Sequence, residues 1–302
     1  MIKTDAGTIT EGAKDNHSLS PKKIRHPRAW ELDFLRGFAI IMVVWDHFMY
    51  DSAYMFGYLW QQGGNPSLVG FADFAQTYFT SPLRNFWWPF FVFVFFFVSG
   101  ICTAFSKNNF ARGLKLGIVA VALSGVTYIV QYVLEIRDAF ILFGVLHCLA
   151  SCILLYAVIE FVMRLINRRK NKWVLPAVCL AVTIIAFVLN SIYNVPLSDV
   201  IQNYATVETD SSIAGLFVFD YDWWTADYFP LLPFFWFFML GATIGHLFYR
   251  NKKSLLPKLD GKWHAFFSIP GKYSLIIYLA SQVLVVGVLA LVTYLVMGEL
   301  AF

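Results

Sequence analysis

The residues best suited to acid–base chemistry lie close together near position 47. His47 directly follows Asp46 and precedes Asp51 by four residues, at the end of the run RGFAIIMVVWDHF at 36–48. On a helix, a carboxylate four residues away lies about one turn further on, where it can fix the tautomer of an imidazole and stabilise its protonated form. We therefore take His47, with Asp46 and Asp51, as the candidate catalytic group.

Arg36 lies at the other end of the same run. Eleven helical residues advance about 16 Å and turn about 1100°, within roughly 20° of a whole number of turns. Arg36 and His47 would therefore share one helix face, with the apolar side chains of Ile40 and Val43 between them. The Arg36 guanidinium could bind an anionic ligand, or it could extend to anionic lipid headgroups.

Three further residues are candidates for substrate binding. His147 stands in FGVLHCLA, about nine residues into an apolar run, and could contact substrate or be a core histidine bonded to a neighbouring helix. Asp227 opens another apolar run, where a carboxylate can bind substrate or cap a helix N-terminus. Arg84 could hold an anionic substrate group or pair with an aspartate.

The composition indicates that a lipid bilayer surrounds these residues. Hydrophobic residues make up 59% of the 302 residues and charged residues 14%, against about 45–50% and about 25% in soluble domains. Apolar runs of about 20 residues are typical of membrane-spanning helices. The predicted fold is an all-α integral membrane protein with about seven transmembrane helices, at residues 33–50, 87–105, 113–134, 139–164, 173–193, 229–249 and 273–297.

The charges between these runs predict the topology. Lysine and arginine cluster before the first run and in every second connection, whereas the two long connections, 51–86 and 194–228, carry more acidic than basic residues. Because cytoplasmic loops are enriched in basic residues, we expect the N-terminus in the cytoplasm and the C-terminus outside. Residues 1–29 are polar and contain no apolar signal segment, so we expect a disordered cytoplasmic tail.

Several other classes of protein lack support in the sequence. The net charge of +4 is explained by the basic connections, so no nucleic-acid partner is expected. The four cysteines fall inside apolar runs, which argues against a disulfide framework or a thiolate metal site. HExxH, P-loop, GxGxxG and GxSxG motifs are absent, so no metal, nucleotide or serine-hydrolase site is predicted.

Five segments, in order, carry a resemblance to a known family. They read WELDFLRGFAIIMVVWDHF at 30–48, PFFVFVFFFVSGICTAFSKNN at 89–109, FGVLHCLA at 143–150, DYFPLLPFFWFFMLGATIG at 227–245 and IPGKYSLIIYL at 269–279. Together they resemble the bacterial relatives of the heparan-alpha-glucosaminide N-acetyltransferase catalytic domain, in the transmembrane acyltransferase superfamily. The arginine and histidine on the first helix also resemble the pattern of the wider membrane O-acyltransferases.

The resemblance implies a multi-pass plasma-membrane enzyme, with residues 30–302 as a transmembrane acyltransferase domain. Such an enzyme would move an acetyl group from cytoplasmic acetyl-CoA, its co-substrate, to a sugar or cell-envelope glycan acceptor at the outer face. Expected partners are therefore membrane lipid, acetyl-CoA and a glycan or amino-sugar acceptor, with no metal. A homo-oligomer is compatible with the sequence.

Residue roles follow from the same resemblance. His47 would act as a base or as a transient acyl carrier, oriented by one of the two neighbouring aspartates. Arg36, Lys107 and Arg112, at the inner end of the predicted helices, would hold the phosphates of CoA, and Arg84, His147 and Asp227 would contact substrate.

The chain departs from the family pattern at two positions. The heparan enzyme has its catalytic histidine in the outer loop after the first helix, but this chain has no histidine between His47 and His147. The last helix reads IYLASQ, with Ser281 where related sequences often have a histidine.

A transporter or flippase of a lipid-linked or small anionic solute is the alternative function, with Arg36, His47 and His147 as relay groups. Transporters often contain repeats, and the two halves of this chain share no evident repeat.

Overall fold

A computed structural model describes residues 29–133, 139–167, 171–193, 214–219 and 227–298, and all regular structure within these ranges is helical. The expected tail, apart from Ala29, and most of the acidic connection 194–228 lie outside the described residues. The helices are α1 (Trp30–Tyr50), α2 (Gly57–Gly63), α3 (Pro66–Thr80), α4 (Pro82–Ile101), α5 (Asn109–Tyr132), α6 (Val145–Ile166), α7 (Val174–Ile192), α9 (Leu231–Phe248), α10 (Ala265–Lys272) and α11 (Ser274–Met297), with a π-helical turn at Asp51–Met55 and 3-10 turns at Cys102–Ala104, Ala214–Leu216, Pro257–Leu259 and Lys262–His264.

Six of the described helices are long and apolar enough to cross a bilayer: α4 with its following 3-10 turn, α5, α6, α7, α9 and α11. The expectation of about seven spans is therefore close. Of the other described helices, α1 is also long enough, with 21 residues, but it contains Glu31, Asp33, Arg36 and Asp46. These charged side chains make α1 too polar to be included among the six, although Asp33, Arg36 and Asp46 form ion pairs within the fold.

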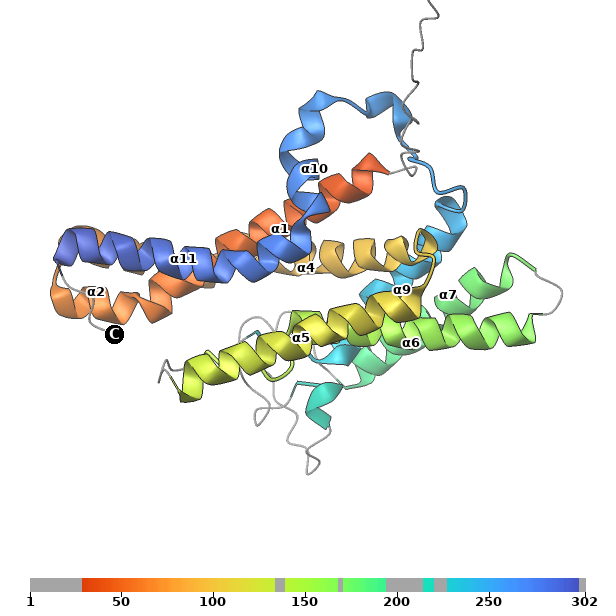
Figure 1. Cartoon of the computed structure of the whole chain (residues 1–302), viewed down its shortest axis with the longest axis horizontal. Coiled ribbons are helices and arrows are strands. Elements are labelled where there is room, and N and C mark those ends of the chain that lie inside the picture. Colours follow the sequence, from red (N-terminus) through yellow and green to blue (C-terminus); the bar gives the residue numbers. More distant parts are fainter. Residues whose placement is uncertain (1–28, 134–138, 168–170, 194–213, 220–226, 299–302) are drawn as a thin grey trace, which may run out of the picture.

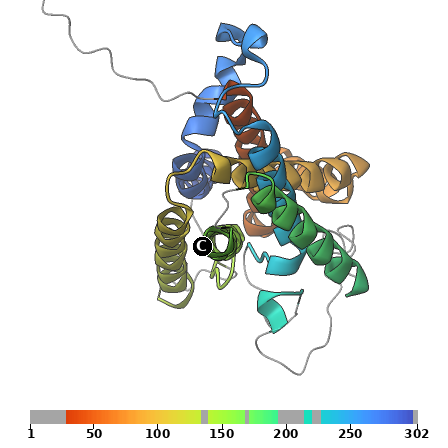
Figure 2. The same cartoon turned by 90° about the vertical axis from the view of Figure 1, so that its right-hand side faces the viewer.

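The helices form two groups that meet along α4 (Figures 1 and 2). α1 packs against α10, α4 and α11, whereas α9 packs against α4 and α7, and α5 pairs with α6. α1 and α4 run side by side in opposite directions, so the start of α1 and the end of α4 lie at one end of the bundle. Side chains from both helices can therefore contribute to a site at either end.

Small residues allow α4 and α9 to approach closely, as expected at helix crossings in membranes. A Cβ atom added at Gly241 would collide with the backbone carbonyl of Phe97, and one at Gly100 would collide with that of Phe238. The crossing therefore requires glycine from both helices. It places the aromatic face of α4 against the start of α9.

The connection 51–86, which we expected to be an outer loop, is largely helical. Asn65 caps α3 by accepting hydrogen bonds from the next backbone N–H groups, and Pro66 follows at the first helical position. Trp60 of α2 is buried and donates a hydrogen bond from its indole to Thr293 of α11 over 2.8 Å. These contacts hold the π-helical turn with Asp51 against α11.

Candidate active site

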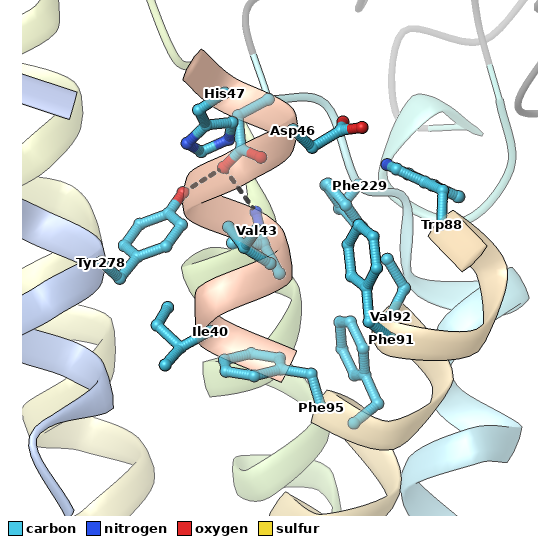
Figure 3. A pocket seen from close by; sticks show the side chains of 13 residues that line it. Ile40, Val43, Asp46, His47, Trp88, Phe91, Val92, Phe95, Phe229 and Tyr278 are labelled. Atoms are coloured by element: carbon cyan, nitrogen blue, oxygen red, sulfur yellow. Dashed lines mark hydrogen bonds between the residues drawn. The ribbon is translucent and has the colours of Figure 1, made fainter. Parts of the chain in front are cut away.

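A cavity of about 60 Å³ lies where α1, α4, α6 and α11 meet the segment that precedes α9 (Figure 3). This volume is several times the space that one water molecule requires. Its lining is mostly apolar and aromatic, with three titratable groups besides Asp46: His47, Asp227 and Tyr278. The full lining is Ile40, Val43, Asp46, His47, Trp88, Phe91, Val92, Phe95, Phe96, Val145, Asp227, Phe229 and Tyr278.

His47 enters the cavity from α1. Ile40 and Val43 line the same cavity, so the predicted helix face that joins them to His47 is confirmed. The His47 ring lies beside that of Tyr278, with ring centroids 6.2 Å apart. Its Nδ1 atom is buried and has no hydrogen-bond partner among the described residues. His47 thus lines the cavity with one ring nitrogen unpaired, and an unpaired imidazole nitrogen can accept a proton or a hydrogen bond.

Asp227 reaches the cavity from the segment before α9. Its Oδ2 atom accepts hydrogen bonds from the hydroxyl of Tyr278 over 2.5 Å and from the backbone N–H of Val145 over 3.2 Å. The carboxylate therefore caps α6, and not the helix that follows it in sequence. Burial raises the pKa of Asp227, an effect that the charge of His47 and the two hydrogen bonds oppose.

Glycine makes this position of Asp227 possible. Asp227 has a left-handed backbone, with φ at 54°, which turns the chain sharply before α9. A Cβ atom at Gly144 would lie 2.7 Å from Asp227 Oδ2. The carboxylate can reach the start of α6 because residue 144 has no side chain.

Asp51 approaches His47 from the π-helical turn that follows α1. Its carboxylate is buried and accepts hydrogen bonds from Nε2 of Gln282 over 3.1 and 3.3 Å. Burial raises the pKa of Asp51 to about 6, although the charge of His47 and the Gln282 amide both act to lower it. His47 is thus influenced by two carboxylates, those of Asp51 and Asp227.

Asp46, in contrast, faces away from His47. The two side chains leave α1 on opposite sides (Figure 3). Both oxygens of Asp46 accept hydrogen bonds from Arg84 at 3.2 Å, and one also accepts from the hydroxyl of Tyr78. Of the two alternatives for Arg84, pairing with an aspartate is therefore observed, and its guanidinium also lies over the rings of Phe79 and Trp88.

His147 lies in the first turn of α6 and not nine residues into a span as we expected. Gly144 ends the preceding irregular segment, so α6 begins only at Val145. Nδ1 of His147 accepts from the backbone N–H of Gly144 over 3.3 Å, and Nε2 lies 3.1 Å from the hydroxyl of Ser124. The ring bonds to its neighbours in this way and does not line the cavity.

Two arginines converge at the opposite end of the α1–α4 pair. Arg36 donates to the carbonyl of Gly271 over 3.3 Å and to the sulfur of Cys102 over 3.1 Å, and lies 3.7 Å from Asp33. Arg112 donates to the carbonyl of Ser99 over 3.2 Å and lies near Cys102 and close enough to Arg36 for the charge of that arginine to act on it.

Arg112 keeps part of its hydrogen-bonding capacity free. Its Nη1 atom is buried without a partner in the described part of the chain.

Lys107, which we grouped with these arginines, lines a second cavity with Glu160 and Arg164.

The sequence analysis missed Tyr278 and Gln282, which hold the two carboxylates beside His47. Both are polar residues in the apolar run of α11, and their spacing of four places them on one helix face. The spacing of these two polar residues was visible in the sequence, but only the fold shows that this face of α11 lies against Asp51 and Asp227.

The fold and the site define a helical membrane protein with a half-buried histidine between carboxylates and a pair of arginines at the other end of the same helix pair. The model of the family "Heparan-alpha-glucosaminide N-acetyltransferase, catalytic" matches residues 28–283, and the chain belongs to this family. It is therefore a multi-pass membrane protein of a transferase family. Neither the curated proteins nor the solved structures include a match to the chain.

Proposed function

We propose that the protein transfers an acetyl group from acetyl-CoA to a hydroxyl or amine of a sugar or cell-envelope glycan, with the chemistry at His47. The observation that carries this proposal is the cavity-lining His47, which has an unpaired Nδ1 and lies beside two buried carboxylates. Membership of the acetyltransferase family supports the reaction class. The acceptor class is inferred from the family description and from the acidic, predicted outer connections.

In the proposed reaction His47 acts as a general base. It takes the proton from the acceptor hydroxyl or amine, whose oxygen or nitrogen attacks the thioester carbonyl carbon. The carbon–sulfur bond then breaks, the thiolate of CoA leaves, and the proton on His47 passes to that sulfur. Asp51 and Asp227 stabilise the imidazolium between these two steps, as a carboxylate does for other catalytic histidines.

The arginine pair suits the donor. Arg36 and Arg112 present two cations, and in the described part of the chain one carboxylate, that of Asp33, forms an ion pair with them. Guanidinium groups bind phosphates through paired hydrogen bonds. The eleven residues from Arg36 to His47 correspond to about 16 Å of helix. An extended pantetheine arm could follow the α1–α4 pair over this distance, with the phosphates at the arginines and the thioester near His47.

Calorimetric titration of the purified protein with acetyl-CoA tests the donor part of this proposal. We expect binding, and Arg112→Gln should weaken it by roughly tenfold or more, because a charge-assisted hydrogen bond contributes about 1.5–3 kcal/mol. Gln retains a hydrogen-bond donor but loses the charge. Absence of any acetyl-CoA binding would contradict the proposal and favour a transporter.

A second assay tests the transfer itself. Membranes with the protein and radiolabelled acetyl-CoA should label amino-sugar or polysaccharide acceptors, or release acetate slowly when no acceptor is added. Binding of acetyl-CoA without transfer to any acceptor and without hydrolysis would contradict the assignment as an enzyme.

A further inference from the structure

A second cavity, of about 200 Å³, lies between the start of α5 and the end of α6 and has no part in the proposed reaction. The start of α5 follows the end of α4, so this cavity is at the same end of the bundle as the two arginines. It is lined by Lys107, Asn108, Asn109, Phe110, Ala157, Glu160, Phe161 and Arg164. Its volume greatly exceeds the space required for one water molecule.

The buried side of this cavity offers hydrogen-bond acceptors. Asn109 is 3% exposed, and its Nδ2 atom donates to Glu160 over 3.1 Å and to the carbonyl of Thr103 over 3.2 Å. These two bonds assign the amide orientation, so the remaining atom, Oδ1, must accept; within the described ranges it has no partner. An unpaired buried acceptor beside a carboxylate favours a ligand with N–H groups.

The rim of the cavity is basic. Lys107 is exposed, and the side chain of Arg164 is 69% exposed although one of its nitrogens lies 2.6 Å from Glu160. The three charged side chains of the lining sum to one positive charge. The rim therefore favours an anionic group, while the buried side favours a hydrogen-bond donor.

The surroundings of the cavity are apolar and exposed. Phe110 and Phe161 line it and are 57% and 62% exposed. Further exposed apolar side chains continue along both helices from this point, namely Leu114, Ile118, Val158 and Leu165. Because α5 and α6 are both candidate membrane spans, acyl chains would contact this surface.

We propose that this cavity binds the headgroup of a phosphatidylethanolamine lipid. In this lipid the acyl chains, the phosphate and the ammonium follow one another, which is the order of the exposed apolar surface, the basic rim and the buried acceptors. Basic pockets between transmembrane helices are a known mode of headgroup binding. The ammonium donates to Asn109 Oδ1 and Glu160, and the phosphate pairs with Lys107 and Arg164.

A headgroup methylation series tests this proposal without altering the protein. Native mass spectrometry of the purified full chain would measure the affinity for dioctanoyl phosphatidylethanolamine, its N-methyl and N,N-dimethyl forms, and phosphatidylcholine. We expect affinity to fall along the series as N–H donors are lost, with phosphatidylcholine bound roughly tenfold more weakly. Equal affinity for the first and last lipid would overturn the proposal.

Three variants locate the lipid. Asn109→Leu should remove the preference for ethanolamine over choline, whereas Lys107→Ala should weaken both lipids by a similar factor and leave the preference intact. Lys115→Ala, an exposed lysine further along α5 that does not line the cavity, should change neither affinity. An unchanged preference in a folded Asn109→Leu protein would refute the assignment.

A nucleotide is the other source of a phosphate beside an amine. Adenosine 3′,5′-bisphosphate should leave the binding of phosphatidylethanolamine unchanged. If it displaces the lipid competitively and this displacement is lost in Lys107→Ala, the cavity binds a nucleotide and the lipid proposal is overturned. The lipid assay requires no acetyl transfer, so its outcome is independent of the proposed reaction.

Discussion

Helix geometry decides which aspartate acts on His47. Successive residues of an α-helix point about 100° apart, whereas residues four apart point only about 40° apart. Asp46 therefore lies on another face of α1, where Arg84 and Tyr78 bind it. Asp51 continues the face of His47, and Asp227 reaches the same histidine from a distant part of the sequence.

Replacement of His47 should remove catalysis but not donor binding. We expect His47→Gln to lower the turnover of acetyl transfer by about 10²–10⁴-fold, because a general base contributes rate enhancement of that size. Glutamine keeps a hydrogen-bonding side chain of similar length but cannot take a proton. Acetyl-CoA binding by calorimetry should change by less than about threefold if only the base is lost. Turnover at the wild-type rate would remove His47 from the mechanism.

The buried carboxyl of Asp51 should make stability depend on pH. Its pKa is raised in the folded protein from 3.8 to about 6, so folding favours the protonated form. The stabilisation is present in full below pH 4 and is lost as the pH rises through about 6. The difference corresponds to at most about 3 kcal/mol, at 1.36 kcal/mol for each pKa unit.

Thermal unfolding in detergent between pH 4 and pH 8 measures this effect. The unfolding midpoint of the wild type should fall as the pH rises, and Asp51→Asn should flatten the part of the fall between about pH 4 and pH 6. Asp227, whose pKa is also raised by burial, remains in this variant and supplies the rest of the slope. A wild-type midpoint that rises between pH 4 and pH 6 while the Asp51→Asn midpoint does not would contradict the assignment.

At the scale of the elements, close helix crossings hold the site together. α4 supplies aromatic residues to the cavity and ends beside the arginine pair, and it packs on α9 through glycine contacts. α6 begins at the cavity, where its first backbone N–H binds Asp227. The position of the carboxylate therefore depends on how α6, α9 and α11 pack together.

A methyl group added at the α4–α9 crossing, as in Gly241→Ala, should lower the stability of the folded protein. The Cβ of Gly241→Ala would overlap the carbonyl of Phe97, and overpacking of this kind costs about 1–3 kcal/mol. Gly287→Ala in α11 is the matched control, because among the described residues no atom outside its own helical turns lies within 4 Å of the added Cβ. The control should be neutral or stabilising by up to about 1 kcal/mol. Equal thermal midpoints for the two variants would contradict the close crossing.

At the scale of the whole molecule, the two ends of the bundle have different roles in the proposed reaction. The end with Arg36 and Arg112 would face the cytoplasm, where acetyl-CoA is present, and the end with α2 and α3 would face outward. The basic connections favour this orientation through the positive-inside rule.

Labelling of single cysteines in intact cells tests the orientation. Gln62→Cys in α2 and Lys253→Cys after α9 are both at exposed positions near opposite ends. A membrane-impermeant maleimide added outside should label Gln62→Cys only, and Lys253→Cys should react after the membrane is opened. Labelling of the wild type, whose described cysteines are buried or half-buried, serves as the background. The reverse pattern would contradict the predicted topology.

The sequence by itself determined that a lipid bilayer surrounds the protein and where most of its helices lie, because both depend on the local run of apolar residues. Long apolar runs indicated the helical membrane fold, and the six spans that the composition supports lie within a few residues of the predicted bounds. The face that joins Ile40, Val43 and His47 also followed from helical periodicity alone. Two helix starts differed from the prediction, and both have local causes. Gly144 precedes α6, which therefore begins later than predicted, and Asn65 and Pro66 start a helix in a predicted loop.

Only the tertiary structure decided the partners of these residues. Asp227 is 180 positions from His47 in the chain, and it reaches the cavity because Gly144 leaves space for it and Tyr278 holds it. Arg84 is committed to Asp46, and Lys107 lies beside Glu160 in a separate cavity. Such pairings depend on how the helices pack together. Packing brings together side chains of different helices, which the periodicity within one helix does not predict.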